Sequence, residues 1–302
     1  MIARKLWLVL FLTLPIILLA ACSRGSSTPE GSQSSLNVQI REVTEPEEIN
    51  PEDLLTVHFI DVGEGDAILL IQGNYAMLVD GGSAEMGTTV LTYLRERGVT
   101  RLEYVVATHP FADHIGGLPD VLRRMTVRNV LLPMVYHDTP AYNAFLFAVE
   151  DSGANVAVPF AGHMFTLGDA IVTVLSPNPT DEWENRANYS IVMRVEFGST
   201  SFLLTGDAMR EVEANLLDIT VRLSSDALKV ARHGASSATT SSFLDAVNPS
   251  IAVISAGTNN SFLSQDVLRR LNNMGIHVFR TDVNGTIVIT SDGTTLGVMV
   301  ER

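Results

Sequence analysis

Cysteine and lysine are almost absent from this chain of 302 residues. Cys22 is the only cysteine, which excludes an intramolecular disulfide and a cluster of thiolate metal ligands. Lys5 and Lys229 are the only lysines, and 34 acidic residues against 20 basic ones give a formal net charge of −14. A chain this acidic repels nucleic acid at long range, because binding to phosphates depends on Lys and Arg. The composition therefore disfavours nucleic acid as a partner.

A long apolar run occurs at one place, residues 6–21, directly after Arg4 and Lys5. The run is short for a membrane span and has the order of a secretory signal peptide. It leads into Leu-Ala-Ala-Cys at residues 19–22, which resembles the lipobox of bacterial lipoprotein signal peptides. That resemblance implies cleavage before Cys22 and lipidation of its thiol; the alternative is an uncleaved N-terminal anchor. Either alternative places the rest of the chain outside the cytoplasm, tethered to a bacterial membrane.

Three segments follow from this organisation. Residues 1–21 are predicted to be the signal peptide, and residues 22–53 the lipidated cysteine and a flexible tether. The tether is rich in serine and then acidic, without apolar periodicity, so no secondary structure is expected there. Residues 54–302 are predicted to form one folded domain, since 46% hydrophobic and 18% charged residues suit a chain with a packed core.

Strands and helices alternate through the predicted domain. Residues 66–73 and 75–82 read as a hairpin that turns at Gly73-Asn74. Strands are expected to end at His109 and at His233, and another hairpin is expected over residues 189–208. The helices predicted from apolar spacing and end signals lie at residues 88–98, 116–125, 210–218, 241–248 and 264–275. Strands interleaved with helices predict a layered α/β sandwich.

Polar side chains with metal-binding chemistry follow these strands. His109, Asp113 and His114 occupy a window of six positions, and Asp207 and His233 come later. Imidazole and carboxylate groups suit zinc, manganese or iron, and such ions activate water against carbonyl or phosphoryl groups. Three plainer roles stay open. The residues could be a vestigial site held by hydrogen bonds, Asp207 could cap the helix after it, and His233 could bind a loop carbonyl.

The order of motifs carries a resemblance to a known family. From Thr56 to the C-terminus the chain reads "HFIDVGEGDAILL", "MLVDGG", "THPFADHIGG", "NYSIVMRVEFGSTSFLLTGDA", "LKVARHGAS", "FLDAVNPSIAVIS" and "VFRTDVNGTIVIT". This order resembles the metallo-β-lactamase fold. More narrowly, it is similar to the extracellular hydrolase-like domain of ComEC-type competence proteins and its stand-alone relatives. The resemblance implies a four-layer αββα sandwich.

Two positions depart from the family pattern. Phe111 stands where the run His-x-His-x-Asp-His has its second histidine, and Arg232 replaces the first histidine of His-His-Gly-Ser. The resemblance implies that Asp207 bridges two metal ions in relatives. If the family's ligand pattern applies to this chain, the site of the first metal retains only His109 and the shared Asp207 as ligands.

The second metal keeps Asp113, His114, Asp207 and His233. The resemblance therefore implies one zinc or manganese ion per chain, or none. Asp113 is the candidate to orient water or act as general base.

Further roles come from the same resemblance. Arg232 is a candidate to bind the substrate anion, since a guanidinium grips phosphate or carboxylate. Asn188, in an Asn-rich segment of the subfamily, is a weaker substrate-binding candidate. Asp66 and Asp80 resemble positions that fix the loops beneath the metals.

Two functions are consistent with these residues. The first is a membrane-anchored, extracytoplasmic, metal-dependent hydrolase that acts on a small phosphodiester or another ester. The ComEC resemblance suggests DNA as the substrate, which the acidic charge disfavours. The second is a degenerate member of the fold that binds a ligand or partner as an accessory lipoprotein for DNA uptake or envelope upkeep. Phe111 and Arg232 favour the second, because they break both histidine motifs.

Overall fold

The computed structural model describes residues 50–219, 221–258 and 261–302. The predicted signal peptide, Cys22 and the tether up to residue 49 lie outside the described residues. A 3-10 helix at Pro51–Asp53 lies within the segment for which the sequence predicted no secondary structure. The carbonyl of Glu52 accepts a hydrogen bond from Gln72 Nε2 at 3.2 Å. In the described part, no helix has the length and apolarity needed to cross a membrane.

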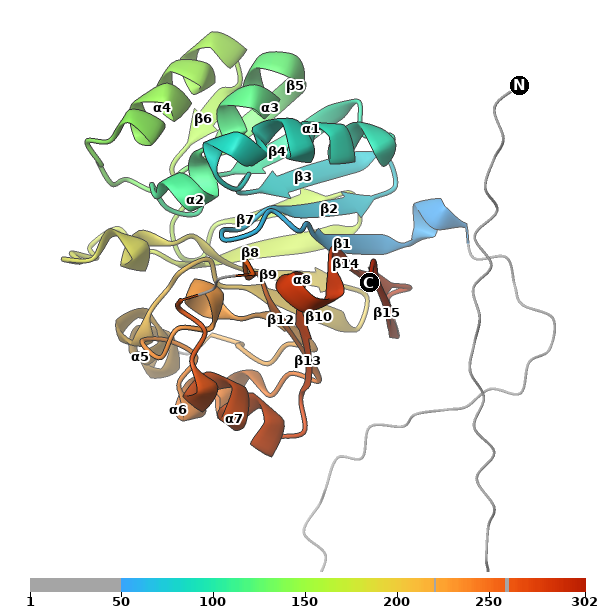
Figure 1. Ribbon diagram of the computed structural model, residues 1–302, viewed down its shortest axis with the longest axis vertical. Helices are drawn as coiled ribbons and strands as arrows, with labels where there is room; N and C mark the ends of the chain where they lie inside the picture. The colour runs from blue at the N-terminus through green and yellow to red at the C-terminus, as the bar shows by residue number, and fades with distance from the viewer. Residues whose placement is uncertain (1–49, 220, 259–260) are drawn as a thin grey trace, which may run out of the picture. The chain divides into compact units, whose positions relative to one another are not determined.

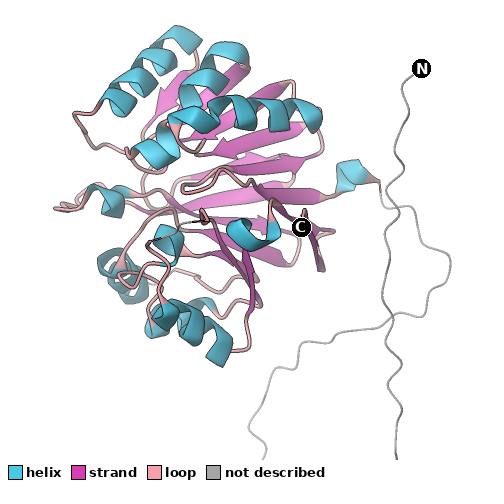
Figure 2. Ribbon diagram, viewed as in Figure 1, coloured by secondary structure: helices cyan, strands magenta, loops and turns pink. Residues whose placement is uncertain are grey.

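Two β-sheets pack face to face (Figures 1 and 2). The first has the order β15-β14-β1-β2-β3-β4-β5-β6, with β1 (Leu55–Phe59), β2 (Ile68–Gln72), β3 (Tyr75–Val79), β4 (Arg101–Val106), β5 (Thr126–Leu131), β6 (Asn155–Ala157), β14 (Ile287–Ser291) and β15 (Leu296–Val300). The second has the order β13-β12-β11-β10-β9-β8-β7, with β7 (Met164–Leu167), β8 (Ala170–Ser176), β9 (Val192–Phe197), β10 (Thr200–Leu204), β11 (Ala227–Lys229), β12 (Ile251–Ile254) and β13 (His277–Arg280).

Helices cover the outer face of each sheet (Figure 1). The first sheet carries α1 (Gly87–Glu96), α2 (Ala112–Ile115), α3 (Leu118–Arg124) and α4 (Pro140–Ser152). The second carries α5 (Arg210–Asp218), α6 (Ser241–Val247) and α7 (Gln265–Asn273), and the short α8 (Thr281–Asn284) precedes β14. The predicted four-layer αββα sandwich is confirmed.

Alternating side chains explain why the sheets stack between helices. On β1, Leu55, Val57 and Phe59 enter the core between the two sheets. On β2, Leu70 enters the same core, whereas its neighbour Leu69 packs under the helices of the first sheet. Successive side chains of a strand point to opposite faces, so each strand contributes to two cores. Complete burial of one such side chain stabilises the fold by roughly 1.5–3 kcal/mol.

Parallel pairing brings the chemistry-bearing loops together. Strands β3, β4 and β5 are parallel neighbours in the first sheet, and β10, β11 and β12 are parallel neighbours in the second. The carboxyl ends of parallel strands share one edge of a sheet, and that edge is where open α/β sheets bind ligands. The loops that carry the predicted ligands leave these ends, so the strand order itself assembles the site.

Two details of secondary structure differ from the prediction. The strand expected to reach His233 ends at Lys229. Arg232 and His233 have φ angles of +48° and +53° within a 3-10 helix, Ala231–Gly234, and this left-handed backbone cannot continue a strand. Helix α4 was not predicted from the sequence. It is capped by a threonine at its N-terminus and by a glycine with left-handed backbone at its C-terminus.

Candidate metal centre

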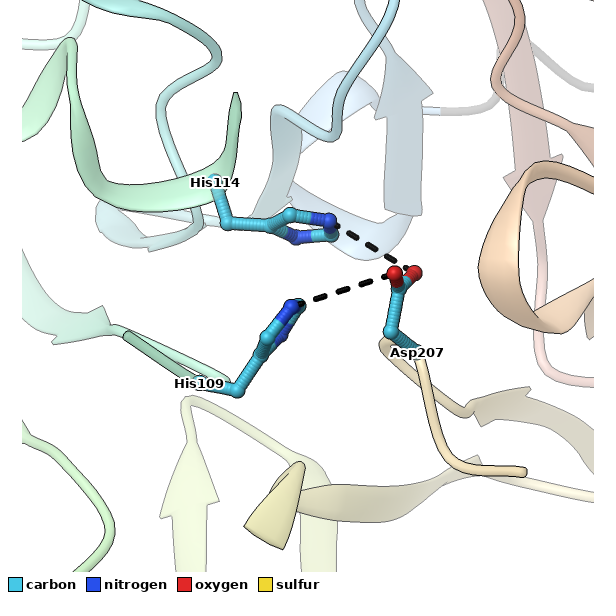
Figure 3. Close-up of side chains that lie close together, drawn as sticks. All are labelled: His109, His114 and Asp207. Atoms are coloured by element: carbon cyan, nitrogen blue, oxygen red, sulfur yellow. Dashed lines mark ion pairs between the residues drawn. The ribbon is translucent and has the colours of Figure 1, made fainter. Parts of the chain in front are cut away.

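All five predicted metal-ligand residues converge at the strand ends. His109 follows β4, and Asp113 and His114 lie on the short helix α2. Asp207 follows β10, and His233 lies in the 3-10 helix after β11. Figure 3 shows the rings of His109 and His114 directed at the carboxylate of Asp207. Residues far apart in sequence, from both sheets, therefore form one cluster.

Four of these side chains bring their donor atoms together. His114 Nε2 lies 3.5 Å from Asp207 Oδ1 and 3.8 Å from Asp113 Oδ2. His233 Nε2 lies 3.6 Å from each of the same two oxygens. Asp113, His114 and His233 form one candidate group for a metal ion, and Asp207 Oδ1 approaches both histidine nitrogens. Imidazole and carboxylate donors suit zinc, so the set can hold one ion.

His109 faces the other oxygen of Asp207. Its Nε2 lies 3.8 Å from Asp207 Oδ2, and His109, His114 and Asp207 together form a second candidate ligand group. If His114 Nε2 binds the first ion, a second ion beside His109 is left, among the described residues of this group, with His109 and the shared Asp207, next to the apolar ring of Phe111. Two ligands do not make a tetrahedral site.

Hydrogen bonds on the outer side of the rings fix the tautomer of each histidine. The Thr108 hydroxyl donates to Asp80 Oδ2 at 2.6 Å, so it accepts at 3.0 Å from His109 Nδ1. Nδ1 of His114 donates to Asp80 Oδ2 at 2.7 Å, and Nδ1 of His233 donates to the carbonyl of Ser255 at 3.1 Å. Each ring therefore directs Nε2 inward, which is how metal-binding histidines are held by their outer partners.

Buried polar atoms at the centre test whether these residues fit a metal. Among the described residues, Nε2 of His109, Nε2 of His114 and Oδ1 of Asp207 are buried without a hydrogen-bond partner. Such atoms carry a desolvation penalty of about 1–3 kcal/mol each unless something binds them. Inward-facing nitrogens and carboxylate oxygens are ligands that zinc and manganese accept. The donor set therefore fits a divalent cation.

Charges within the cluster are unevenly shared. Burial lowers the pKa of His114, but the carboxylates of Asp207 and Asp80 outweigh it and raise this pKa to about 10. Burial and the neighbouring His114 lower the pKa of His109 to about 3. Burial raises the pKa of Asp207, yet His233 and His114 hold it below its usual range. Burial lowers the pKa of His233 too, but the carboxylate of Asp207 and the hydrogen bond with Asp113 raise it above its usual value. Without an ion, both His114 and His233 therefore favour the protonated form.

Asp113 lies on the open side of the cluster. About a third of its side chain is exposed, whereas His114, His233 and Asp207 are buried. Burial raises the pKa of Asp113, but the hydrogen bond with His233 and the charge of His114 bring it down to about 2. A carboxylate this acidic accepts hydrogen bonds but is a weak base at neutral pH. Its geometry suits orienting a water molecule better than removing its proton.

Phe111 lies beside His109. Its ring packs edge-on against the ring of His109, with centroids 4.9 Å apart. The ring of His137, a loop histidine, also packs on Phe111, with centroids 5.5 Å apart. An apolar side chain therefore borders His109, and the interpretation of Phe111 as a lost ligand stays a prediction.

Arg232 and Asn188 make contacts within the protein. The guanidinium of Arg232 lies 3.0 Å from Met209 Sδ and stands over the ring of Phe262 at 5.9 Å. Asn188 accepts a hydrogen bond from Met209 N at 3.0 Å and donates to Glu211 at 3.2 Å. These contacts give Asn188 a positioning role in the loop after Asp207. The substrate contacts expected of Arg232 and Asn188 stay predictions.

The plainer roles considered for Asp207 and His233 have different outcomes. Met209, not Asp207, precedes the first residue of α5, so the helix-capping alternative for Asp207 is wrong. His233 does bind a loop carbonyl, that of Ser255. This contact involves Nδ1 and leaves Nε2 facing the cluster, so it is compatible with metal binding.

The place of Lys229 beneath the candidate metal centre was not predicted from the sequence. Its ammonium group forms a buried ion pair with Asp66, beneath the histidines. A single lysine within an apolar strand was the signal that could have identified it, because an unpaired lysine is almost never fully buried. Asp66 and Asp80 lie beneath the ligands, as predicted from the resemblance.

Comparison with known proteins agrees with this geometry. The model of the family described as "Metallo-beta-lactamase superfamily" matches residues 60–258. "ComE operon protein 3" of Bacillus subtilis (strain 168) is 30% identical over 251 residues, which cover 76% of this chain and 32% of that protein. "Competence protein ComA" of Neisseria gonorrhoeae is 28% identical over 241 residues, 78% of this chain and 32% of that protein. The chain thus spans about a third of the length of these relatives.

Solved structures agree on the fold. The metallo-beta-lactamase fold protein YhfI from Bacillus subtilis matches with a TM-score of 0.52 at 15% identity, over 81% of this chain and all of that one. At such low identity the likeness concerns the fold alone. The family match, by contrast, extends over more than half of the sequence and includes His109, Asp113, His114, Asp207 and His233. The chain belongs to the metallo-β-lactamase superfamily and has competence proteins of the ComEC type among its relatives.

Proposed function

We propose that this chain is an extracytoplasmic, lipid-anchored hydrolase that uses one zinc or manganese ion to cleave a small phosphodiester or another ester. The observation that carries the proposal is the inward direction of Nε2 in three buried histidines, each held by an outer hydrogen bond. Hydrogen bonding of the outer nitrogen is the usual support of metal-binding histidines. A purely structural cluster would have no need to leave inner nitrogens of His109 and His114 without partners.

Asp113, His114, Asp207 and His233 would hold the ion, because the Nε2 atoms of both histidines lie within 3.5–3.8 Å of both carboxylate oxygens. When bound, a divalent ion would supply Lewis-acid activation of water and of the ester oxygen, provided that its coordination expands to a fifth position on the open side beside Asp113. Asp113 would orient the water, since its carboxylate is ionised and borders the open side.

Arg232 would bind the anion of the substrate. Its side chain is half-buried, and it contacts Met209 and Phe262. Among the described residues, no carboxylate forms an ion pair with this guanidinium, whose charge would suit a phosphate group. Phe111 would place an apolar surface next to the ester, on the side of His109.

The location and the size of the substrate rest on the sequence. The apolar run before Cys22 and the lipobox-like residues support a lipid anchor, and the competence-protein relatives are consistent with a role in the envelope. A net charge of −14 disfavours a long polyanion, so a small ester is the better substrate.

Hydrolysis of a chromogenic ester tests the proposal. We expect the full chain in detergent, loaded with zinc or manganese, to cleave bis(p-nitrophenyl) phosphate or p-nitrophenyl acetate. Asp113→Ala should reduce the rate by roughly a hundredfold or more, because it removes both an ion ligand and the group that orients water. His163→Ala is the matched control, since this exposed histidine lies outside the cluster. An ion-loaded chain without activity on either ester would contradict the proposal and favour the binding-protein alternative.

The affinity for zinc is expected to depend on pH through His114. Its pKa of about 10 in the ion-free cluster means that its proton must leave before Nε2 accepts an ion. The carboxylate of Asp207 also raises the pKa of His233, so titrations between pH 6 and pH 8 should show zinc binding that tightens by about tenfold or more per pH unit.

The ion-free protein should respond to pH in the opposite direction. A pKa raised from 6.5 to about 10 gives stability that is fully present below pH 6.5 and is lost as the pH rises through 10. We expect the free energy of unfolding of the ion-free chain to fall across this range in urea titrations. Zinc affinity that is independent of pH would contradict this assignment of the proton.

Phe111→His tests whether this position is a former ligand. The new imidazole would lie next to His109 and share Asp207, so elemental analysis should rise from about one ion per chain towards two. Arg232→His is the comparison and should stay at one, because the Arg232 side chain contacts Met209 and Phe262. No gain for Phe111→His would refute its reading as a lost ligand.

A further inference from the structure

Lys229 is a buried cation that has no part in the chemistry described so far. It is the last residue of β11, and its side chain has no exposed surface. Lysine is almost never fully buried unless it is paired, and a buried ammonium group loses its hydration. Its place among apolar strands therefore needs a physical reason.

The ammonium group of Lys229 joins loops of both sheets. It forms an ion pair with Asp66, which lies in the loop between β1 and β2 of the first sheet. It also donates a hydrogen bond to the carbonyl of Gly206 at 3.0 Å, in the turn after β10 of the second sheet. The next residue in that turn is the ligand Asp207. One side chain thus connects the two halves of the fold directly beneath the metal centre.

Asp66 lies behind two of the metal-binding histidines. Its Oδ2 is 3.7 Å from Nδ1 of His114, and its Oδ1 is 4.0 Å from Nδ1 of His233. These two nitrogens already donate to Asp80 and to the carbonyl of Ser255. A carboxylate without a cation partner would compete for the same N–H groups and turn the rings. The ion pair with Lys229 holds Asp66 away from that competition.

Gly206 shows how closely the turn before Asp207 is fitted. Its φ angle is +52°, and a side chain there would approach atoms of Ser190 and Thr108 to 3.1 Å. Its carbonyl also accepts a hydrogen bond from the backbone N–H of Arg232 at 3.3 Å. The group that Lys229 binds therefore connects the turn of Asp207 with the segment that carries His233.

We propose that Lys229 is a positioning residue of the metal centre. Its ammonium group fixes the Asp66 carboxylate beneath His114 and His233, and it fixes the Gly206 turn that directs Asp207. The inference rests on the proposed metal site and adds the group that holds the ligand-bearing loops in position. It differs from a role in stability alone, because it predicts a loss of metal affinity in chains that remain folded.

Zinc affinity of the full chain in detergent tests the inference by competition with a chromogenic chelator. Lys229→Met keeps the apolar stem and removes the ammonium group, and zinc binding should weaken by roughly tenfold or more. Arg194→Met is the matched control. Arg194 is a buried cation of β9, paired with Glu196 at 2.5 Å and the carbonyl of Ser224 at 3.1 Å, neither of which belongs to the centre. This control should stay within about threefold of the unaltered chain.

A neutral pair separates positioning from stability, and it covers the case in which Lys229→Met does not fold. In Asp66→Asn with Lys229→Met, no unpaired charge is buried, so the stability of the ion-free chain in urea should return towards that of the unaltered chain. Zinc affinity should remain reduced, because the carbonyl of Gly206 still lacks the hydrogen bond from the Lys229 ammonium group.

Recovery of zinc affinity in the double variant to within about threefold of the unaltered chain would overturn the role of the Gly206 contact, because the unpaired charge of Asp66 alone would then account for the loss. A loss for Lys229→Met no larger than that for Arg194→Met would overturn the inference. If the unaltered chain bound no zinc, the proposed metal site would fail first, and the inference with it. Zinc binding that is equal in the unaltered chain and the variants refutes only the role of Lys229.

Discussion

The buried carboxylate of Asp80 is the contact on which the metal centre depends. It accepts hydrogen bonds from the backbone N–H of Thr108 at 2.8 Å, from the Thr108 hydroxyl at 2.6 Å and from His114 Nδ1 at 2.7 Å. These bonds link the ends of β3 and β4 to helix α2. Because the Thr108 hydroxyl is committed to Asp80, it must accept from His109. One carboxylate thereby directs two histidines.

The cluster is rich in carboxyl groups. Those of Asp66, Asp80, Asp113 and Asp207 lie around the histidines, and among the described residues Lys229 forms an ion pair with one of them, Asp66. Buried carboxylates are stable only when cations or donors compensate them. In the ion-free chain, protons on His114 and His233 would supply part of this compensation. A divalent ion held by these residues would supply more.

Much of the fold could be predicted from the sequence, because the signals were local. The apolar runs of β2 and β3 and the Gly73-Asn74 turn require only neighbouring residues, and the spacing of His109, Asp113 and His114 indicates metal binding directly. The helix α4 also had local signals, and its buried Tyr142 and Phe145 lie at helical spacing, but the exposed Phe147 obscures the apolar stripe in the sequence. The length of β11 was overestimated, because the turn to a left-handed backbone after it is set by packing between loops.

The partners of Lys229 and Arg232 could not be predicted in this way. Lys229 meets Asp66 only because the two sheets stack, and no periodicity in either segment refers to the other. The direction of the Arg232 side chain follows from its left-handed backbone and from contact with Met209 and Phe262. Such contacts arise from the assembled fold, whereas the ligand set followed from motifs.

Anomalous diffraction from crystals soaked in zinc would locate the bound ions. We expect one zinc peak per chain, at about 2.0–2.2 Å from donor atoms of Asp113, His114, Asp207 and His233. We expect no second peak between His109 and Phe111. Two peaks, or a single peak held by His109 without His233, would contradict the single-ion centre.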